Sequence, residues 1–257
     1  MITAPLAERG AEPLAVARSV VFARIGGPGL VEQAVRRIGE AIGLGLLEVG
    51  DRLPSEPELA EQLGIAPMTL RQALGILREA GYVETRRGRG GGTFVSRAAP
   101  PAPVRVARKR LASFTVGDLR DLIDFRVATA CAAAALASER ATQTELGSLR
   151  QLVEAMASAS AYRDFRRADT RFHLSIASAA GSRRLAAAEA SIQTEIADLL
   201  ALIPHPPEAL RVSNGQHRAI LEAISRRDED GARALTEAHV RGTGDFLIGL
   251  RLGRVGA

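Results

Sequence analysis

The stretch LPSEPELAEQLGIAPMTLRQALGILREAGYVETRRGRGGGTFVS, residues 53–96, contains the patterns of two helices and a β-hairpin in close succession. Ser55 is followed three residues later by Glu58, the pattern of a capping box, which predicts a helix over about 56–63. A second helix is predicted over about 67–80 and opens on a proline, which is favoured in a first helical turn. The short alternating runs YVETRR and TFVSR flank GRGGG and predict the hairpin.

A further helix is predicted immediately before this stretch. Between residues 30 and 47, apolar side chains recur at spacings of three and four, the period of an amphipathic helix. The order helix, short helix, helix and hairpin is that of a winged helix-turn-helix, in which a helix fits the major groove of DNA. We therefore expect a DNA-binding domain over residues 29–97, preceded by a loose N-terminal tail over 1–28.

Residues 53–96 resemble the DNA-binding domain of the GntR family of bacterial transcription regulators. The resemblance is carried by Leu-Pro-Ser-Glu at the start, by Gly-x-Phe-Val after the wing, and between them by Glu58-Leu59-Ala60, Leu63-Gly64, Arg71, Ala73-Leu74, Leu77, Gly81, Val83 and Gly88. It implies that the helices and the wing contact DNA through Ser55, Met68, Thr69, Arg71, Arg86, Arg87, Arg89 and Gly90.

Two places in this chain depart from the family pattern. Pro57 stands where the family usually has an arginine, and Ala66-Pro67 stands where it usually has Ser or Thr followed by an arginine. Two arginines that commonly contact DNA are therefore missing. We expect an operator preference unlike the common family site.

The formal charge is unevenly distributed along the chain. Residues 1–110 contain 16 Lys and Arg against 11 Asp and Glu, whereas residues 111–257 contain 18 of each, so the net charge of +5 lies in the first part. Eight basic residues and no acidic residue fall between 86 and 110. Such a strip either faces DNA phosphates, which Lys and Arg bind without regard to sequence, or forms a solvated linker.

The composition of the 257-residue chain is that of a globular protein, with 46% hydrophobic and 25% charged residues. No apolar run approaches the roughly 18 residues of a membrane span, and the N-terminus lacks a clear signal-peptide pattern. Cys131 is the only cysteine, which excludes an intrachain disulfide and fits a reducing cytoplasm.

The remainder of the chain is predicted to be an all-helical domain. Three prolines between residues 98 and 116 mark a linker, and the domain follows over 117–252. A bend or a short separate helix near 117–123 is left open. The fold class is therefore mostly α, a winged helix-turn-helix with a small β-hairpin wing and then a helical bundle. Its helices are expected near 118–139, 142–158, 161–179, 182–203, 207–227 and 230–251.

Asp169 and His173 stand four residues apart in a predicted helix, so their side chains share one face. His217 and His239 lie on two later helices joined by a tight turn, which puts them at similar heights. One carboxylate and three imidazoles are a suitable ligand set for Zn²⁺, Ni²⁺ or Mn²⁺. Spacing alone leaves open the alternative that these residues make only local polar contacts.

Residues 118–250 resemble the helical effector domain, called FCD, of the FadR-type branch of the GntR family. The resemblance is carried by an Ala-rich helix with Arg126, and by Asp169-x-x-Phe172-His173-x-x-Ile176, Gly181, His217-x-x-Ile220-x-x-Ala223-Ile224, Asp230, Ala232 and His239. Two residues depart from the pattern, since Ala130 and Gln216 stand where the family often has Glu.

The resemblance to the FCD domain implies a metal centre that is not catalytic. The Asp and three His residues would hold one divalent metal per subunit, and the metal would receive the carboxylate of a small organic acid. Arg126 would be a second anchor for that carboxylate, because its guanidinium matches two oxygens; the alternative is a salt bridge on the surface or between helices. Ser213 and Asn214, one turn before His217, are further effector-binding candidates.

These features predict a homodimeric, ligand-responsive regulator of transcription and not an enzyme. It would bind a near-palindromic operator in the cytoplasm, and repression is the common mode in the family. The alternative is a metal-dependent hydrolase or lyase with an accessory DNA-binding module, which would need a general base beside the metal. No Asp or Glu stands at an obvious helical spacing from His217 or His239 for that role.

Overall fold

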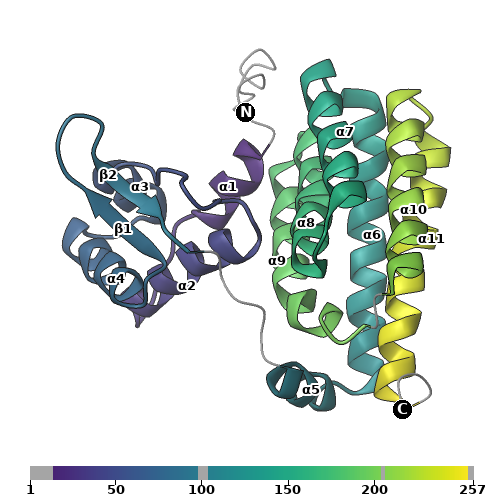
Figure 1. Ribbon diagram of the computed structural model, residues 1–257, viewed down its shortest axis with the longest axis horizontal. Helices are drawn as coiled ribbons and strands as arrows, with labels where there is room; N and C mark the ends of the chain where they lie inside the picture. The colour runs from purple at the N-terminus through teal and green to yellow at the C-terminus, as the bar shows by residue number, and fades with distance from the viewer. Residues whose placement is uncertain (1–13, 98–103, 204–205, 254–257) are drawn as a thin grey trace. The chain divides into compact units, whose positions relative to one another are not determined.

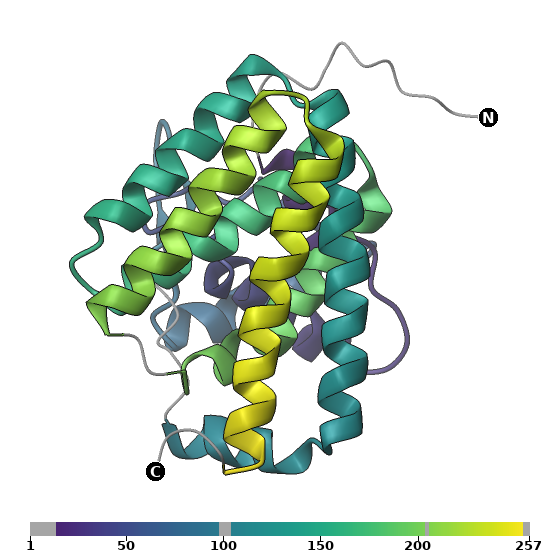
Figure 2. The same cartoon turned by 90° about the vertical axis from the view of Figure 1, so that its right-hand side faces the viewer.

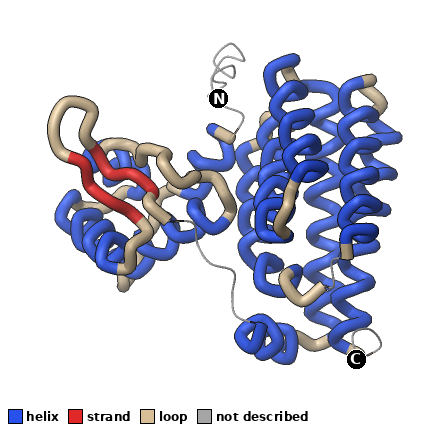
Figure 3. Tube along the Cα trace, in the orientation of Figure 1, coloured by secondary structure: helices blue, strands red, loops and turns tan. Residues whose placement is uncertain are grey.

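The structure is a computed structural model that describes residues 14–97, 104–203 and 206–253 (Figure 1). The chain divides into two compact units, Arg18–Pro100 and the remaining residues. Helices dominate both, and within the described ranges the only strands form one hairpin in the first unit (Figure 3). The predicted fold class, mostly α with a small β-hairpin wing, is confirmed.

The first unit is built on a three-helix core with a hairpin beside it. Helix α2 packs against α4, as does α3, and together they bury Ile38, Leu59 and Leu70. The two strands pair antiparallel with Val83 opposite Val95, so the inward residue of each strand joins the core. The elements up to residue 97 are α1 (Ala15–Val21), α2 (Leu30–Gly43), α3 (Glu56–Leu63), α4 (Pro67–Glu79), β1 (Val83–Arg86) and β2 (Gly92–Val95).

Helix α3 begins with the capping box that the sequence predicts. The backbone N–H and the hydroxyl of Ser55 donate to Oε2 of Glu58 at 2.9 and 2.7 Å. These two hydrogen bonds to one carboxylate fix the direction in which the chain enters the helix. Both Ser55 and Glu58 are exposed. These bonds also lower the pKa of the exposed Glu58 carboxyl.

The wing between β1 and β2 is a tight loop that requires glycine. A Cβ atom on Gly91 would lie 2.5 Å from the carbonyl oxygen of Arg86, so no larger residue fits without moving backbone. Gly90 has φ of 84°, in the left-handed region that favours glycine. The loop therefore keeps its backbone compact while the arginines between the glycines stay exposed.

Part of the predicted N-terminal tail over 1–28 is helical, which corrects that expectation. Residues 1–13 lie outside the described ranges, but α1 follows them, and Val21 and Phe22 at its end are buried. Arg18 donates from Nε to the carbonyl of Leu46 at 2.5 Å and pairs with Asp51 at 3.4 Å. The helix is only seven residues long, too short for its apolar period to be recognised in the sequence.

The linker expected over 98–116 also contains a helix, α5 (Val104–Ser113). It buries Ala107 and Leu111, and its Arg110 pairs with Asp198 of α9 at 3.1 Å. The helix was not predicted because Ala107 and Leu111, its two buried positions, stand among basic residues that follow three prolines. This half of the linker is therefore part of the second unit.

The second unit is a bundle of long helices, and each predicted helix of the domain is present within a few residues of its expected ends. Helix α6 is continuous from Val116, so there is no separate helix at 117–123. Figure 2 shows α11 running between α6 and α10, and α11 packs against both. The helices after α5 are α6 (Val116–Arg140), α7 (Gln143–Ser158), α8 (Tyr162–Ala179), α9 (Arg183–Leu200), α10 (Pro207–Ser225) and α11 (Glu229–Arg251).

Helices α6 and α11 approach closely where a glycine of α11 faces an isoleucine of α6. A Cβ atom on Gly244 of α11 would lie 2.6 Å from Cδ1 of Ile123, so glycine is needed where the helices approach.

In the turn that leads into α11, Arg227 has φ of 60°. Its guanidinium donates to the carbonyls of Ser138 and Ala141 at 2.7 and 2.8 Å, which satisfies groups at the C-terminal end of α6.

Candidate metal centre and DNA-contacting surface

Three helices of the second unit bring one carboxylate and three imidazoles together. Asp169 and His173 lie one turn apart on α8, His217 lies on α10 and His239 on α11. One potential ligand atom from each lies within 4.8 Å of the others, and all four side chains are buried. The four residues that the spacing singled out are therefore neighbours in space.

The distances within this cluster suit a single metal ion. Nε2 of His217 lies 3.2 Å from Oδ1 of Asp169 and 3.2 Å from Nε2 of His239. Ligand atoms bound at about 2.0–2.2 Å to one tetrahedral or octahedral ion are separated by roughly 3–3.6 Å. Nε2 of His173 is buried without a hydrogen-bond partner among the described residues, at a cost of about 1–3 kcal/mol that a metal would remove.

The protonation states of the cluster also suit a metal. Burial, followed by the neighbouring His217, lowers the pKa of His239 to about 3. Burial likewise holds the pKa of His173 well below its usual range, against the opposing effect of Asp169. Both imidazoles are therefore neutral near pH 7 and offer lone pairs.

Asp169 remains ionised although it is buried. Burial alone would raise its pKa, but the charge of Arg166 and the hydrogen bond with His217 hold it well below its usual range. Arg166 donates to Oδ2 of Asp169 and also to Oγ1 of Thr170, the latter at 3.2 Å. One oxygen of Asp169 is thus used by Arg166, and Oδ1 is left toward the histidines.

Gln216 orients one of the histidines from outside the cluster. Its Oε1 accepts a hydrogen bond from Nδ1 of His239 at 2.9 Å. Because the proton is then on Nδ1, Nε2 carries the lone pair and points toward His217. The sequence marked Gln216 only as a departure from the family pattern and did not predict this contact.

Arg126 lies in the interior of the bundle and not on its surface. The side chain is only 5% exposed, and its Nε has no hydrogen-bond partner among the described residues. The charge of Arg126 lowers the pKa of both His173 and His239, which places the guanidinium near the cluster. A buried cation beside a metal site is suited to an anionic ligand.

The two other predicted effector residues lie about two turns into α10. Ser213 is half-buried, whereas Asn214 is buried and donates from Nδ2 to the carbonyl of Val153 on α7 at 3.1 Å. The amide nitrogen of Asn214 therefore connects two helices, and only its Oδ1 lacks a partner within the described part of the chain.

Two buried polar residues near Arg126 were missed by the sequence analysis. Glu189 and Gln193 lie one turn apart on α9, and they are 1% and 0% exposed. Burial raises the pKa of Glu189, against the opposing charge of Arg126. Their spacing of four predicts a shared helix face, but α9 carries other charged residues and its sequence does not mark these two as buried.

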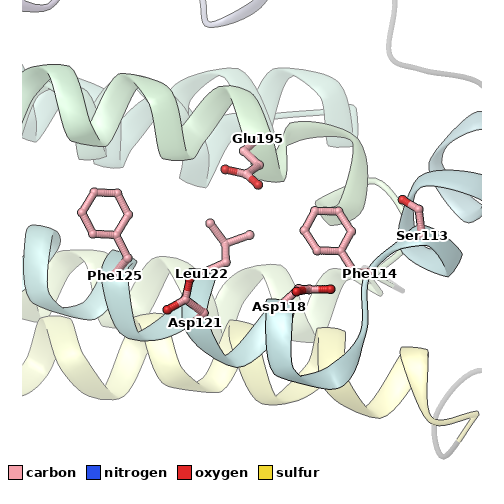
Figure 4. Close-up of a pocket in the computed structure, with 7 residues that line it drawn as sticks. All are labelled: Ser113, Phe114, Asp118, Asp121, Leu122, Phe125 and Glu195. Carbon is pink, nitrogen blue, oxygen red and sulfur yellow. The ribbon is translucent and has the colours of Figure 1, made fainter.

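An open pocket of about 430 Å³ lies elsewhere in the second unit, between α6 and α9 (Figure 4). Figure 4 shows carboxylates on both sides of it and no basic side chain among those that line it. Such a lining does not suit a carboxylate ligand. The residues are Ser113, Phe114, Asp118, Asp121, Leu122, Phe125 and Glu195.

In the first unit, the residues expected to contact DNA lie on exposed parts of α4 and the α3 N-terminus. Met68 is 61% exposed, Thr69 is half-buried and Arg71 is exposed. Nε of Arg71 pairs with Oε2 of Glu56 at 3.0 Å, which connects α4 to the first turn of α3. Ser55, which directly precedes Glu56, is exposed as well.

The wing adds three exposed arginines. Arg86 pairs with Glu84 at 2.7 Å, and its guanidinium lies 4.3 Å from the centre of the Phe94 ring. Arg87 and Arg89 are exposed on either side of Gly88. The aromatic contact orients Arg86, whereas the other two remain available for phosphates.

Comparison with known proteins assigns both units to families. The model for bacterial regulatory proteins of the gntR family matches residues 30–95, and the model for the FCD domain matches residues 121–242. No helix within the described ranges is long and apolar enough to cross a membrane.

Several curated proteins are similar over most of the chain. RmpR of Mycobacterium gastri, described as an HTH-type transcriptional regulator, is 38% identical over 223 residues, covering 85% of this chain and 80% of RmpR. An Escherichia coli K12 protein named for regulation of the L-lactate dehydrogenase operon is 30% identical, covering 82% and 83%. Among solved structures, E. coli McbR/YncC has a TM-score of 0.50 at 20% identity, covering 86% of this chain and 98% of that one, and shows the same fold.

Proposed function

Because this chain belongs to the GntR family of bacterial transcription regulators and carries an FCD domain, we propose that it is a homodimeric, metal-dependent repressor released by a small organic acid. DNA binding and regulation follow from the family. We assign residues 29–97 to DNA binding, 98–116 to the connection between domains and 117–252 to effector binding. The observation that carries the finer proposal is the buried Asp-His₃ cluster.

The metal centre would hold one divalent ion per subunit, with Zn²⁺, Ni²⁺ and Mn²⁺ as candidates. Oδ1 of Asp169 and ring nitrogens of His173, His217 and His239 would be the ligands. The bound ion would supply positive charge for a carboxylate. Arg126 would bind the same carboxylate from α6, because no described residue uses its Nε.

Operator binding would occur in the cytoplasm through two copies of the first unit. Each copy would place α4 in the major groove and the wing against the backbone, so a symmetric dimer would select a near-palindromic sequence. In our proposal Ser55, Met68, Thr69 and Arg71 contact one half-site, and Arg86, Arg87, Arg89 and Gly90 form the wing contact. Pro57 and Pro67 stand where the family often has arginine, so the preferred operator should be distinct.

The choice of a small organic acid is supported by the site and by one relative. A cationic interior made of a metal and Arg126 is complementary to a carboxylate. The E. coli relative is named for an L-lactate dehydrogenase operon, and L-lactate is such an acid. The alternative of a metal-dependent hydrolase or lyase has no support from the comparisons, in which the relatives are regulators.

The proposal is tested by a two-step titration of the full chain. Selection from random duplexes identifies the operator, and fluorescence anisotropy then measures operator affinity with and without Zn²⁺, Ni²⁺ or Mn²⁺ and a panel of small carboxylic acids. We expect an acid to weaken operator binding only in the metal-loaded protein. Loss of response on adding a chelator supports the metal centre. An identical response in chelated protein, or binding of less than about a tenth of an equivalent of metal, contradicts it.

A further inference from the structure

A second buried polar group lies on the side of the metal cluster that α6 and α9 form. It consists of Arg126 on α6 and Glu189 and Gln193 on α9, each at most 5% exposed. Helix α9 packs against both α6 and α8, so this group and the cluster share one interior. Of these three residues, the proposed carboxylate site includes only Arg126.

The hydrogen bonds inside this group are incomplete. Nε2 of Gln193 donates to Oε1 of Glu189 at 2.7 Å. Oε2 of Glu189 and Oε1 of Gln193 are both buried, and neither has a hydrogen-bond partner among the described residues. Both unpaired atoms of α9 are acceptors, so these two residues lack a donor, whereas the unpaired Nε of Arg126 lacks an acceptor.

The group also interacts electrostatically with the metal cluster. Burial lowers the pKa of Arg126, and the charges of Glu189 and Asp169 oppose that shift. Burial raises the pKa of Glu189, and the charge of Asp169 adds a smaller effect in the same direction. The acceptors of α9 are therefore within electrostatic range of Arg126 and Asp169, on a helix that packs against the helices of both.

We propose that Glu189 and Gln193 select the effector through a second functional group on the acid whose carboxylate is held by the metal and Arg126: a hydroxyl, which donates one hydrogen bond to either residue, or an ammonium, which can donate to both. This inference rests on the proposed function of the same site. An acid without a donor would leave both acceptors buried and unpaired, and this cost would make the site discriminate strongly. Bound water is the competing occupant, and it would give no such discrimination.

Two series of acids with matched skeletons test the selection: propionate, lactate and alanine, and succinate, malate and aspartate. Isothermal titration of each into the metal-loaded full chain measures the affinity. We expect at least one donor-bearing acid to bind about tenfold or more tightly than its parent acid. Comparing the hydroxy and amino members of a series distinguishes the two donors.

Two substitutions connect the preference to α9. Glu189→Leu should reduce the preference for the donor-bearing acid to the part that Gln193 alone supports and leave the affinity for the parent acid within about twofold, while Glu189→Gln, which retains an acceptor at this position, should reduce the preference less. Glu195→Gln is the matched control, because this half-buried carboxylate lies on the same helix and lines the pocket of Figure 4. Thermal melting establishes that each variant is folded.

The outcomes separate this inference from the proposed function. If the wild type binds propionate and lactate equally and succinate and malate equally, with no gain for the amino acids, the selection is wrong and the carboxylate site stands. A preference that is undiminished in Glu189→Leu also contradicts it. If no acid of either series binds the metal-loaded wild type, the proposed effector site itself fails, and this inference fails with it.

Discussion

Gln216 holds His239 in the tautomer that leaves its Nε2 free, through a hydrogen bond of 2.9 Å from Nδ1 to the amide oxygen. The two residues lie on neighbouring helices, α10 and α11, so the bond also fixes the ring relative to His217. Residues that orient a ligand in this way contribute to metal affinity without touching the metal.

Substitution of Gln216 should weaken metal binding. Gln216→Leu removes the acceptor and should lower metal affinity about 10–100-fold, as measured by competition with a chromophoric chelator. Gln216→Glu retains an acceptor at the same place and should restore affinity to within a few-fold of wild type. Equal affinity in wild type and Gln216→Leu would show that His239 needs no such orientation.

Removal of one cluster histidine should abolish metal-dependent stability. His173→Ala takes away one of four ligands, and metal that binds only the folded chain stabilises it by roughly 4 kcal/mol at 1,000 times its dissociation constant. We expect chelation to lower the Tm of the wild type and to leave that of the variant unchanged. His205→Ala is the control, since His205 lies outside the described residues and is the remaining histidine of the chain. Operator binding without effector should persist in both variants.

Arg71 should contribute to operator recognition. Arg71→Ala should cost about 1–3 kcal/mol on the selected operator if it contacts a base or a well-placed phosphate. Arg78→Ala is the matched control on the same helix, because its Nη1 donates to Thr85 of β1 at 3.0 Å. Anisotropy titrations on the operator and on a scrambled duplex make the comparison, and an unchanged operator affinity for Arg71→Ala would remove it from the recognition surface.

Arg89 in the wing should act through charge alone. Arg89→Ala should weaken binding to operator and scrambled duplex by similar factors, and the slope of log affinity against log salt should become shallower by about one. A loss confined to the operator would instead indicate that Arg89 contacts a base. The measurement is the same titration repeated at several salt concentrations.

The buried carboxyl of Glu189 should make stability depend on pH. Burial raises its pKa in the folded chain above its ordinary value of 4.5, so the folded state binds the proton more tightly than the unfolded state. Its favourable contribution is present below about pH 4.5 and is lost as pH rises through the folded pKa. Glu189→Gln should therefore stabilise the metal-free protein relative to wild type more at pH 7 than at pH 4.5, as measured by urea unfolding. A difference in unfolding free energy that is constant with pH would contradict this.

Much of the fold follows from local patterns in the sequence. Ser55 and Glu58 form the predicted capping box, and the long helices of the second unit carry enough turns for their apolar period to be recognised. The helices α1 and α5 were missed because they are short and adjoin glycine, proline or basic residues. In such segments tertiary packing determines the structure more than local preference does.

The candidate site shows the same division between local and tertiary information. The spacing of Asp169 and His173 predicts a shared face, and the turn between the last helices predicts that His217 and His239 lie close together. Glu189 and Gln193 could not be placed beside Arg126, because only the packing of α9 on α6 brings them there. A carboxylate on a predicted helix is ordinarily exposed, and nothing in the local sequence of α9 marks this one as buried.

The close contact between Gly244 and Ile123 has a consequence for how a signal would leave the effector domain. Because Gly244 and Ile123 leave no space between them, α6 and α11 resist sliding past each other at this point. Helix α6 runs unbroken from Val116, about 15 Å along the axis from Arg126. In the proposed regulator, a displacement of Arg126 would therefore move both helices and reach the first turn of α6, which follows α5 and the DNA-binding unit in the chain.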